Sequence, residues 1–109
     1  MTEHRQRGLE SYAAGEIRFV RGVIPETFAA FDRTTIAFAH VDLDLYAPIK
    51  AACAFIFPRL LVGGAMVFDD YGWASCPGPC KAVDDYFADR PESVLVLPTG
   101  QACVVKLRR

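Results

Sequence analysis

Two apolar segments of the chain, TTIAFAHVD (34–42) and AMVFDD (65–70), are rich in strand-forming residues, and each ends on aspartate. Nearly continuous apolar runs are typical of strands covered on both faces, as in parallel sheets. Between them, PIKAACAFIFPRLL (48–61) spaces apolar side chains three and four residues apart, which predicts an amphipathic helix with Pro48 in its first turn. A connection of about twenty residues suits a right-handed crossover, so these segments predict a βαβ unit.

The flanking segments extend this pattern on both sides. Before the unit, we expect a helix over 4–14 that Gly15 ends, a short strand over 16–22, and a helical turn within 24–31. After it, we expect a loop over 71–79, a helix over 80–90, and two tightly joined antiparallel strands, SVLVLP (93–98) and QACVVKL (101–107). The whole chain, 1–109, therefore reads as one α/β domain with a mostly parallel sheet and an antiparallel last strand.

Composition narrows the functional classes. Hydrophobic residues make up 52% of the chain, charged residues 23%, and the formal net charge is −1, so we expect neither a nucleic-acid partner nor a membrane partner. The N-terminus is polar, and no apolar run reaches the length of about 18 residues that crosses a bilayer, which predicts a cytoplasmic protein. The four cysteines (Cys53, Cys76, Cys80 and Cys103) lack paired metal-ligand spacing and favour neither zinc nor disulfides.

The chemistry of the chain is concentrated at the ends of the two apolar strands. Asp42 and Asp44 follow the first strand, and Asp69 and Asp70 follow the second. Neighbouring parallel strands end at the same edge of a sheet, so these carboxylates should converge and repel one another unless a cation or a proton intervenes. A set of oxygen ligands without histidine or cysteine matches Mg²⁺. A single aspartate at such a position is more often a helix cap, but four at two adjacent strand ends favour a cation site.

Other polar and aromatic residues give weaker evidence of a functional role. His40 lies within an apolar strand, where a hydrogen-bonded core imidazole is the favoured interpretation. Lys50 and Lys81 are expected to be solvated helix charges. Tyr71 and Trp73 follow the acids, where they either line a substrate pocket or pack on the edge of the core.

The segments HVDLDLY, PRLLVGG, FDDYG and CPGPCKAVDDYF, in this order and spacing, resemble the macrocin O-methyltransferase family. These are class I S-adenosylmethionine-dependent enzymes with a Rossmann-like fold that methylate sugar hydroxyls of natural products. The resemblance extends from residue 18 to the C-terminus and implies Mg²⁺ (or Mn²⁺) held by Asp42, Asp69 and Asp70. It also implies that Asp44 acts as the base on a sugar-containing small-molecule substrate.

The family pattern is incomplete in these 109 residues. The early glycines, Gly8, Gly15 and Gly22, do not follow an apolar strand in a GxG arrangement, so the turn that holds S-adenosylmethionine in the family has no counterpart and cofactor-binding residues cannot be assigned. By comparison, the first two strands are missing, which leaves the strand over 36–41 with an open edge. We therefore expect a homodimer that covers this edge and no methylation by the chain alone. Two alternatives remain, a metal- or nucleotide-sugar-binding module that uses DLD as a DxD motif and a relic without activity.

Overall fold

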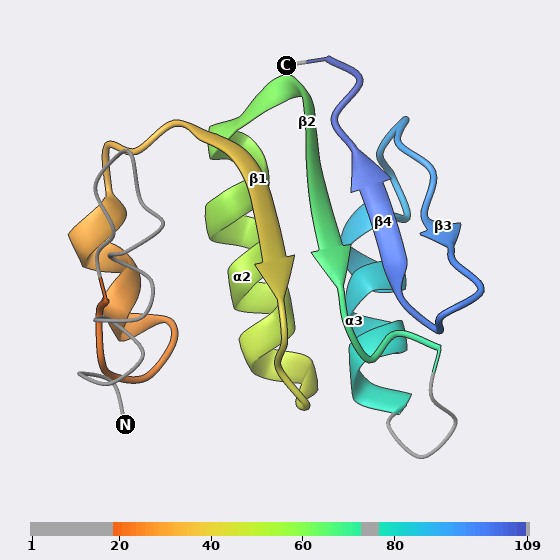
Figure 1. Ribbon diagram of the computed structural model, residues 1–109, viewed down its shortest axis with the longest axis horizontal. Helices are drawn as coiled ribbons and strands as arrows, with labels where there is room; N and C mark the ends of the chain where they lie inside the picture. The colour runs from red at the N-terminus through yellow and green to blue at the C-terminus, as the bar shows by residue number, and fades with distance from the viewer. Residues whose placement is uncertain (1–18, 73–76, 109) are drawn as a thin grey trace, which may run out of the picture.

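The computed structural model describes residues 19–72 and 77–108. Its centre is a four-stranded sheet in the order β1-β2-β4-β3, and two helices, α2 and α3, cover one face of it (Figure 1). A short 3-10 helix, η1 (Glu26–Phe31), lies beside α2 and β1 and confirms the helical turn expected within 24–31. The helix expected over 4–14 lies outside the described residues.

The βαβ unit is confirmed. Strand β1 (Ile36–Val41) pairs in parallel with β2 (Leu60–Phe68), and α2 (Tyr46–Arg59) connects them. The helix ends earlier than the sequence predicts, and β2 begins earlier, because Leu60 already has extended backbone angles. Gly63 and Gly64 therefore lie inside the strand, in a stretch where the ladder register shifts between β1 and β2.

The antiparallel end of the sheet is also confirmed. Strand β4 (Ala102–Val105) pairs antiparallel with β2 and with β3 (Leu95–Val96). The turn between β3 and β4 is closed by a hydrogen bond of 2.8 Å from the Leu97 amide to the Gln101 carbonyl, and Gly100 has a φ of 88°. Only glycine adopts this left-handed conformation without a steric penalty, so the TG signal marks a real turn.

Two further predicted elements differ from the structure. The helix α3 (Pro77–Phe87) begins within the segment expected to be a loop, because proline lacks an N–H that the first helical turn would leave unpaired. The strand expected over 16–22 is wrong for its described part, since residues 19–22 form no strand. Its preceding residues lie outside the described part of the chain.

The core fills the space between the helices and the sheet. Its largest fully buried side chains come from α2, β2, α3 and β4: Ile49, Cys53, Met66, Phe68, Pro79, Val83 and Val104. Phe87 of α3 packs edge-to-face against Phe57 and Phe68, with ring centroids 5.1 and 6.5 Å apart. This packing fixes α3 against both α2 and β2. Asp42 and Asp44 precede α2, and Asp69 and Asp70 follow β2.

The chain also leaves apolar side chains uncovered. Phe38 on β1 is 61% exposed, and Leu95 and Val96 on β3 are both more than half exposed. Within the described residues, β1 pairs only with β2, so its other edge is open, as the sequence predicts. No helix in the described residues is both long and apolar enough to span a membrane.

Candidate metal centre

The parallel pairing of β1 and β2 brings the two acidic segments together. Val41 and Phe68 are register partners at the ends of the strands, and the Asp69 amide donates a 3.0 Å hydrogen bond to the Val41 carbonyl. The segment after β1 then carries Asp42 and Asp44 into α2, while the segment after β2 carries Asp70. Both acidic segments therefore leave the same edge of the sheet.

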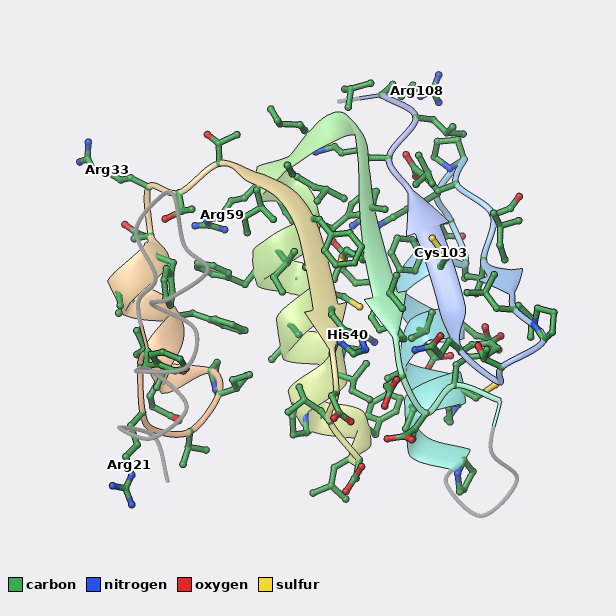
Figure 2. The ribbon with its side chains drawn as sticks, in the orientation of Figure 1. Arg21, Arg33, His40, Arg59, Cys103 and Arg108 are labelled. Atoms are coloured by element: carbon green, nitrogen blue, oxygen red, sulfur yellow. The ribbon has the colours of Figure 1, made fainter. Side chains whose placement is uncertain are left out.

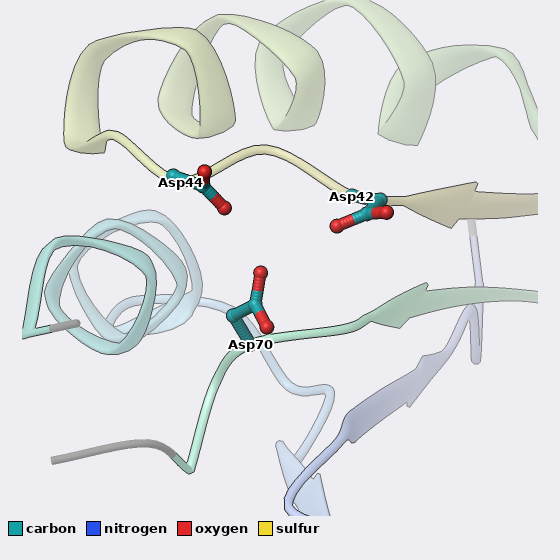
Figure 3. Close-up of side chains that lie close together, drawn as sticks. All are labelled: Asp42, Asp44 and Asp70. Atoms are coloured by element: carbon teal, nitrogen blue, oxygen red, sulfur yellow. The ribbon is translucent and has the colours of Figure 1, made fainter. Parts of the chain in front are cut away.

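Three of the four aspartates form a cluster. Asp42, Asp44 and Asp70 each offer a carboxylate oxygen, and these oxygens all lie within 4.8 Å of one another. Figure 3 shows the three side chains pointing toward one another across the gap between the two segments. Asp42 and Asp44 are exposed and Asp70 is partly buried, so the cluster is open to solvent on one side. Exposed carboxylates in this arrangement suit a cation that retains water ligands.

The electrostatics of Asp70 reflect this crowding. Desolvation raises the pKa of Asp70, and a hydrogen bond with Asp44 and the charges of Asp42, Asp44 and Asp69 raise it further. A divalent cation held among these acids would relieve the repulsion between them. The donor set is all-oxygen and hard, which fits Mg²⁺ or Mn²⁺ rather than zinc.

Asp69 has other partners. Its Oδ1 atom accepts a 2.8 Å hydrogen bond from Gln101 Nε2 and lies 3.3 Å from His40 Nε2. Gln101, and to a smaller extent His40, hold the pKa of Asp69 below its usual range. The structure therefore places Asp69 at the predicted strand end but outside the cluster that Asp42, Asp44 and Asp70 form.

The structure corrects the interpretation of His40. The sequence favoured a core imidazole, but the side chain is 48% exposed and faces Asp69. Figure 2 shows His40 on β1, near the acidic end of that strand. Side chains alternate between the two faces of a strand, and His40 points to the face of β1 that no helix covers. The apolar residues around His40 in the sequence had suggested a strand covered on both faces.

Gln101 is a site residue that sequence reasoning missed. It follows the β3–β4 turn directly and also accepts a 2.9 Å hydrogen bond from Thr99 Oγ1. The only available signal was its position just before a strand expected to run antiparallel. The end of β2 pairs with the start of β4, so Gln101 lies beside the acids that follow β2.

A cavity of about 580 Å³ lies between the segment after β2 and α3. Its lining comprises Tyr71, Gly72, Pro77, Cys80, Lys81, Asp84 and Asp85. Tyr71 lines this cavity and packs partly against the core, which confirms the packing, while a role in a substrate pocket stays a prediction. Trp73 lies outside the described residues.

A larger hollow of about 1,220 Å³ lies at the opposite end of the sheet, around the residues that precede β1 and begin β2. Two of the cationic side chains that line it, Arg59 and Lys106, have hydrogen-bond partners. Arg59, between η1 and α2 in Figure 2, binds Asp32, and Lys106 donates to the Phe57 and Pro58 carbonyls at the end of α2. Its acidic residues, Asp32, Asp89 and Glu92, form no cluster like that of Asp42, Asp44 and Asp70 among the described residues, and we assign the hollow no role.

The comparisons with known proteins identify the class. Residues 5–94 match the family described as macrocin O-methyltransferase (TylF), so the chain belongs to this family. It is 36% identical over 74 residues to demethyldecarbamoylnovobiocin O-methyltransferase from Streptomyces niveus, a match that covers 67% of this chain and 27% of that protein. The relatives and structural neighbours are O-methyltransferases, as the sequence predicts.

Solved structures agree with the fold. The O-methyltransferase NovP matches with a TM-score of 0.82 at 26% identity, over 97% of this chain and 45% of that one. CalS11, a TDP-rhamnose 3'-O-methyltransferase of calicheamicin biosynthesis, matches with a TM-score of 0.63 at 32% identity, over 79% of this chain and 38% of that one. The fold is therefore a fragment of a methyltransferase fold, and the chain spans less than half the length of these relatives.

Proposed function

We propose that this chain forms the metal- and acceptor-binding part of an S-adenosylmethionine- and Mg²⁺-dependent O-methyltransferase that acts on a sugar hydroxyl of a natural product. The observation that carries the proposal is the convergence of three carboxylates from two segments at one edge of the sheet. Family membership supports methyl transfer and the cofactor, and the chemistry of the acids supports the metal.

In this proposal, Asp42, Asp69 and Asp70 hold the cation. The first and the last already lie in the cluster, whereas Asp69 lies outside it, beside Gln101, and has to turn toward Asp70 to join the cation. A magnesium ion bound there supplies positive charge that lowers the pKa of an acceptor hydroxyl and fixes its orientation. The chain contributes the ligands and their spacing, and the neighbouring charges that help raise the pKa of Asp70 are a repulsion that a bound cation would relieve.

Asp44 is the proposed base. Its carboxylate lies in the cluster, within reach of any hydroxyl held beside Asp42 and Asp70. It accepts the hydroxyl proton as the acceptor oxygen attacks the sulfonium methyl group of S-adenosylmethionine, and S-adenosylhomocysteine leaves. The sugar hydroxyl is a poor nucleophile at neutral pH, so removal of its proton and its alignment with the methyl group are the two contributions that the site has to make.

Cofactor binding is the part of the reaction for which we assign no residues. These 109 residues contain no GxG turn after an apolar strand. Alignment of the methyl group with the acceptor accounts for a large share of barrier lowering, on the order of 7–11 kcal/mol. We therefore expect the chain alone to show no detectable turnover on any sugar.

We also propose that a second copy of the chain covers the open edge of β1. Exposed edge strands associate readily, and Phe38 adds an exposed aromatic side chain to this one. A two-fold dimer is the simplest closed arrangement.

A second candidate function is supported by the DLD segment. Both of its acids, Asp42 and Asp44, lie in the cluster, which is also the arrangement that a nucleotide-sugar-binding DxD motif requires. Titration separates the two functions. Saturable calorimetric binding of S-adenosylmethionine supports the methyltransferase, whereas binding of a nucleoside diphosphate only with Mn²⁺ supports the DxD module and rejects our proposal.

A further inference from the structure

Two tyrosines follow the two acidic segments, and both donate to neighbouring aspartates on α3. Tyr46, two residues after Asp44, donates a 2.7 Å hydrogen bond to Asp85 Oδ2. Tyr71, directly after Asp70, donates a 2.6 Å hydrogen bond to Asp84 Oδ1. Each acidic segment is thus tied to the same helix by one phenol–carboxylate contact.

The position of α3 explains how two adjacent residues reach two different segments. Consecutive residues point about 100° apart around a helix, so Asp84 and Asp85 leave α3 in different directions. The first turn of α3 also touches the segment after β1, because a Cβ atom on Gly78 would lie 3.1 Å from the Tyr46 nitrogen. The helix therefore approaches both acidic segments closely enough to set their positions.

These hydrogen bonds belong to the stronger class. An O–H group that donates to a carboxylate makes a charge-assisted bond, which is shorter and about twice as strong as a neutral one. The carboxylates have additional support, since Asp84 accepts from Cys80 Sγ at 3.5 Å and Asp85 lies 3.5 Å from Lys81 Nζ. Each aspartate is therefore a fixed acceptor for its tyrosine.

The segment that carries Asp70 is held at further points. Its amides donate from Asp69 to the Val41 carbonyl and from Gly72 to the Gly100 carbonyl, the latter at 2.7 Å. A Cβ atom on Gly72 would lie 2.9 Å from that carbonyl oxygen, so the close approach requires glycine. Tyr71, between these two backbone contacts, adds a side-chain hydrogen bond to α3.

We propose that Asp84 and Asp85 are positioning residues of the metal centre, which hold the segments that carry Asp70 and Asp42 at their mutual distance through Tyr71 and Tyr46. Mutually repelling carboxylates move apart unless their backbone is fixed, and a cation site needs them together before the ion arrives. Groups that orient metal ligands in this way typically contribute about 10- to 100-fold in metal affinity. The inference rests on the cation site of the proposed function and adds the groups that preorganise it.

The test is calorimetry with Mn²⁺ alone on the full chain. Tyr71→Phe removes one hydroxyl without changing charge, and we expect it to weaken Mn²⁺ binding by about 10-fold. Asp84→Ala should weaken binding at least as much, whereas Asp84→Asn, whose amide oxygen still accepts from Tyr71, should restore most of the affinity. Tyr46→Phe and Asp85→Ala should behave in parallel.

Tyr86→Phe is the matched control. It removes a hydroxyl from the same helix, but Tyr86 packs against Phe57 and Phe87, away from the acids, so its Mn²⁺ affinity should equal that of the wild type. Circular dichroism and the midpoint of thermal unfolding, measured on every variant, separate loss of folding from loss of positioning. Should Asp84→Ala fail to fold, Tyr71→Phe and Asp84→Asn carry the test.

Two failures are distinguishable. A wild-type chain that does not bind Mn²⁺ overturns the cation site itself, and with it both the proposed function and this inference. A wild-type chain that binds Mn²⁺ while folded Tyr71→Phe and Tyr46→Phe bind it equally well overturns only the inference and leaves the two tyrosines with a purely structural role.

Discussion

Gln101 Nε2 donates a 2.8 Å hydrogen bond to Asp69 Oδ1. This contact ties one of the four aspartates at the ends of β1 and β2 to the turn between β3 and β4. Asp42, Asp44 and Asp70 form the cluster without it. The contact defines a competition, because Gln101 holds the Asp69 carboxylate outside the cluster, and this carboxylate has to turn toward Asp70 to join a cation there.

Replacement of Gln101 tests this competition. In Gln101→Ala the Asp69 carboxylate has lost its main hydrogen-bond partner, so we expect Mg²⁺ or Mn²⁺ affinity to rise several-fold, measured by calorimetry. Thr99→Ala, which removes a contact to Gln101 but leaves the amide in place, is the control. Weaker metal binding by Gln101→Ala would instead mean that the amide orients Asp69 as a ligand.

The Tyr46–Asp85 contact predicts a dependence of stability on pH. The Tyr46 hydroxyl, followed by the nearby Lys81, holds the pKa of Asp85 below its usual range. The contribution is therefore complete above the ordinary aspartate pKa of about 4 and is lost as the pH falls through the lower folded value. Tyr46→Phe should be less stable than the wild type at pH 6 to 7, and the difference should shrink below about pH 4 in denaturant titrations. A difference that is constant over this range would contradict the assignment.

The core predicts a contrast between two phenylalanines. Phe68 is 1% exposed and packs against Phe87, so Phe68→Ala should lower the free energy of unfolding by about 3–5 kcal/mol. Phe38 is 61% exposed, and Phe38→Ala should cost less than about 1 kcal/mol in a monomer. Urea titrations at several protein concentrations measure both changes.

Phe38 also tests the proposed dimer. We expect sedimentation velocity to show a dimer of the wild type and a monomer of Phe38→Lys, because lysine on an edge strand opposes association. Phe38→Leu, which keeps an apolar side chain, should remain dimeric. A wild-type chain that sediments as a monomer at all concentrations would reject the dimer.

The sequence predicted the βαβ unit well, because two apolar runs, Ile36–Val41 and the later residues of Leu60–Phe68, leave few alternatives once a helix of suitable length connects them. The boundaries were harder. Gly63 and Gly64 resemble a break but lie in a strand, and Pro77 resembles a loop but begins a helix. Glycine is rare within strands but is tolerated where the strand register is irregular, and proline is rare within helices but is tolerated in the first turn.

The convergence of the acids at one edge of the sheet was predicted, but the direction of each side chain was not. Sequence spacing brings four aspartates to one edge, yet Asp44 rather than Asp69 completes the cluster in the structure. Asp69 and Asp70 are consecutive residues that leave the end of β2 in different directions, and Gln101, which is 32 residues from Asp69 along the chain, contacts Asp69 only after β4 pairs with β2. Tertiary partners of this kind leave no local pattern in a single sequence.

Titration of Mn²⁺ into the wild-type chain and three single variants tests the central claim most directly. We expect one saturable site per chain in the wild type, loss of binding in Asp42→Ala and Asp70→Ala, and retained binding in Asp44→Asn, whose role is to accept the proton. Circular dichroism of each variant establishes that it is folded. Equal affinity of the wild type, Asp42→Ala and Asp70→Ala, or no saturable binding by the wild type, would contradict a metal centre at the ends of β1 and β2.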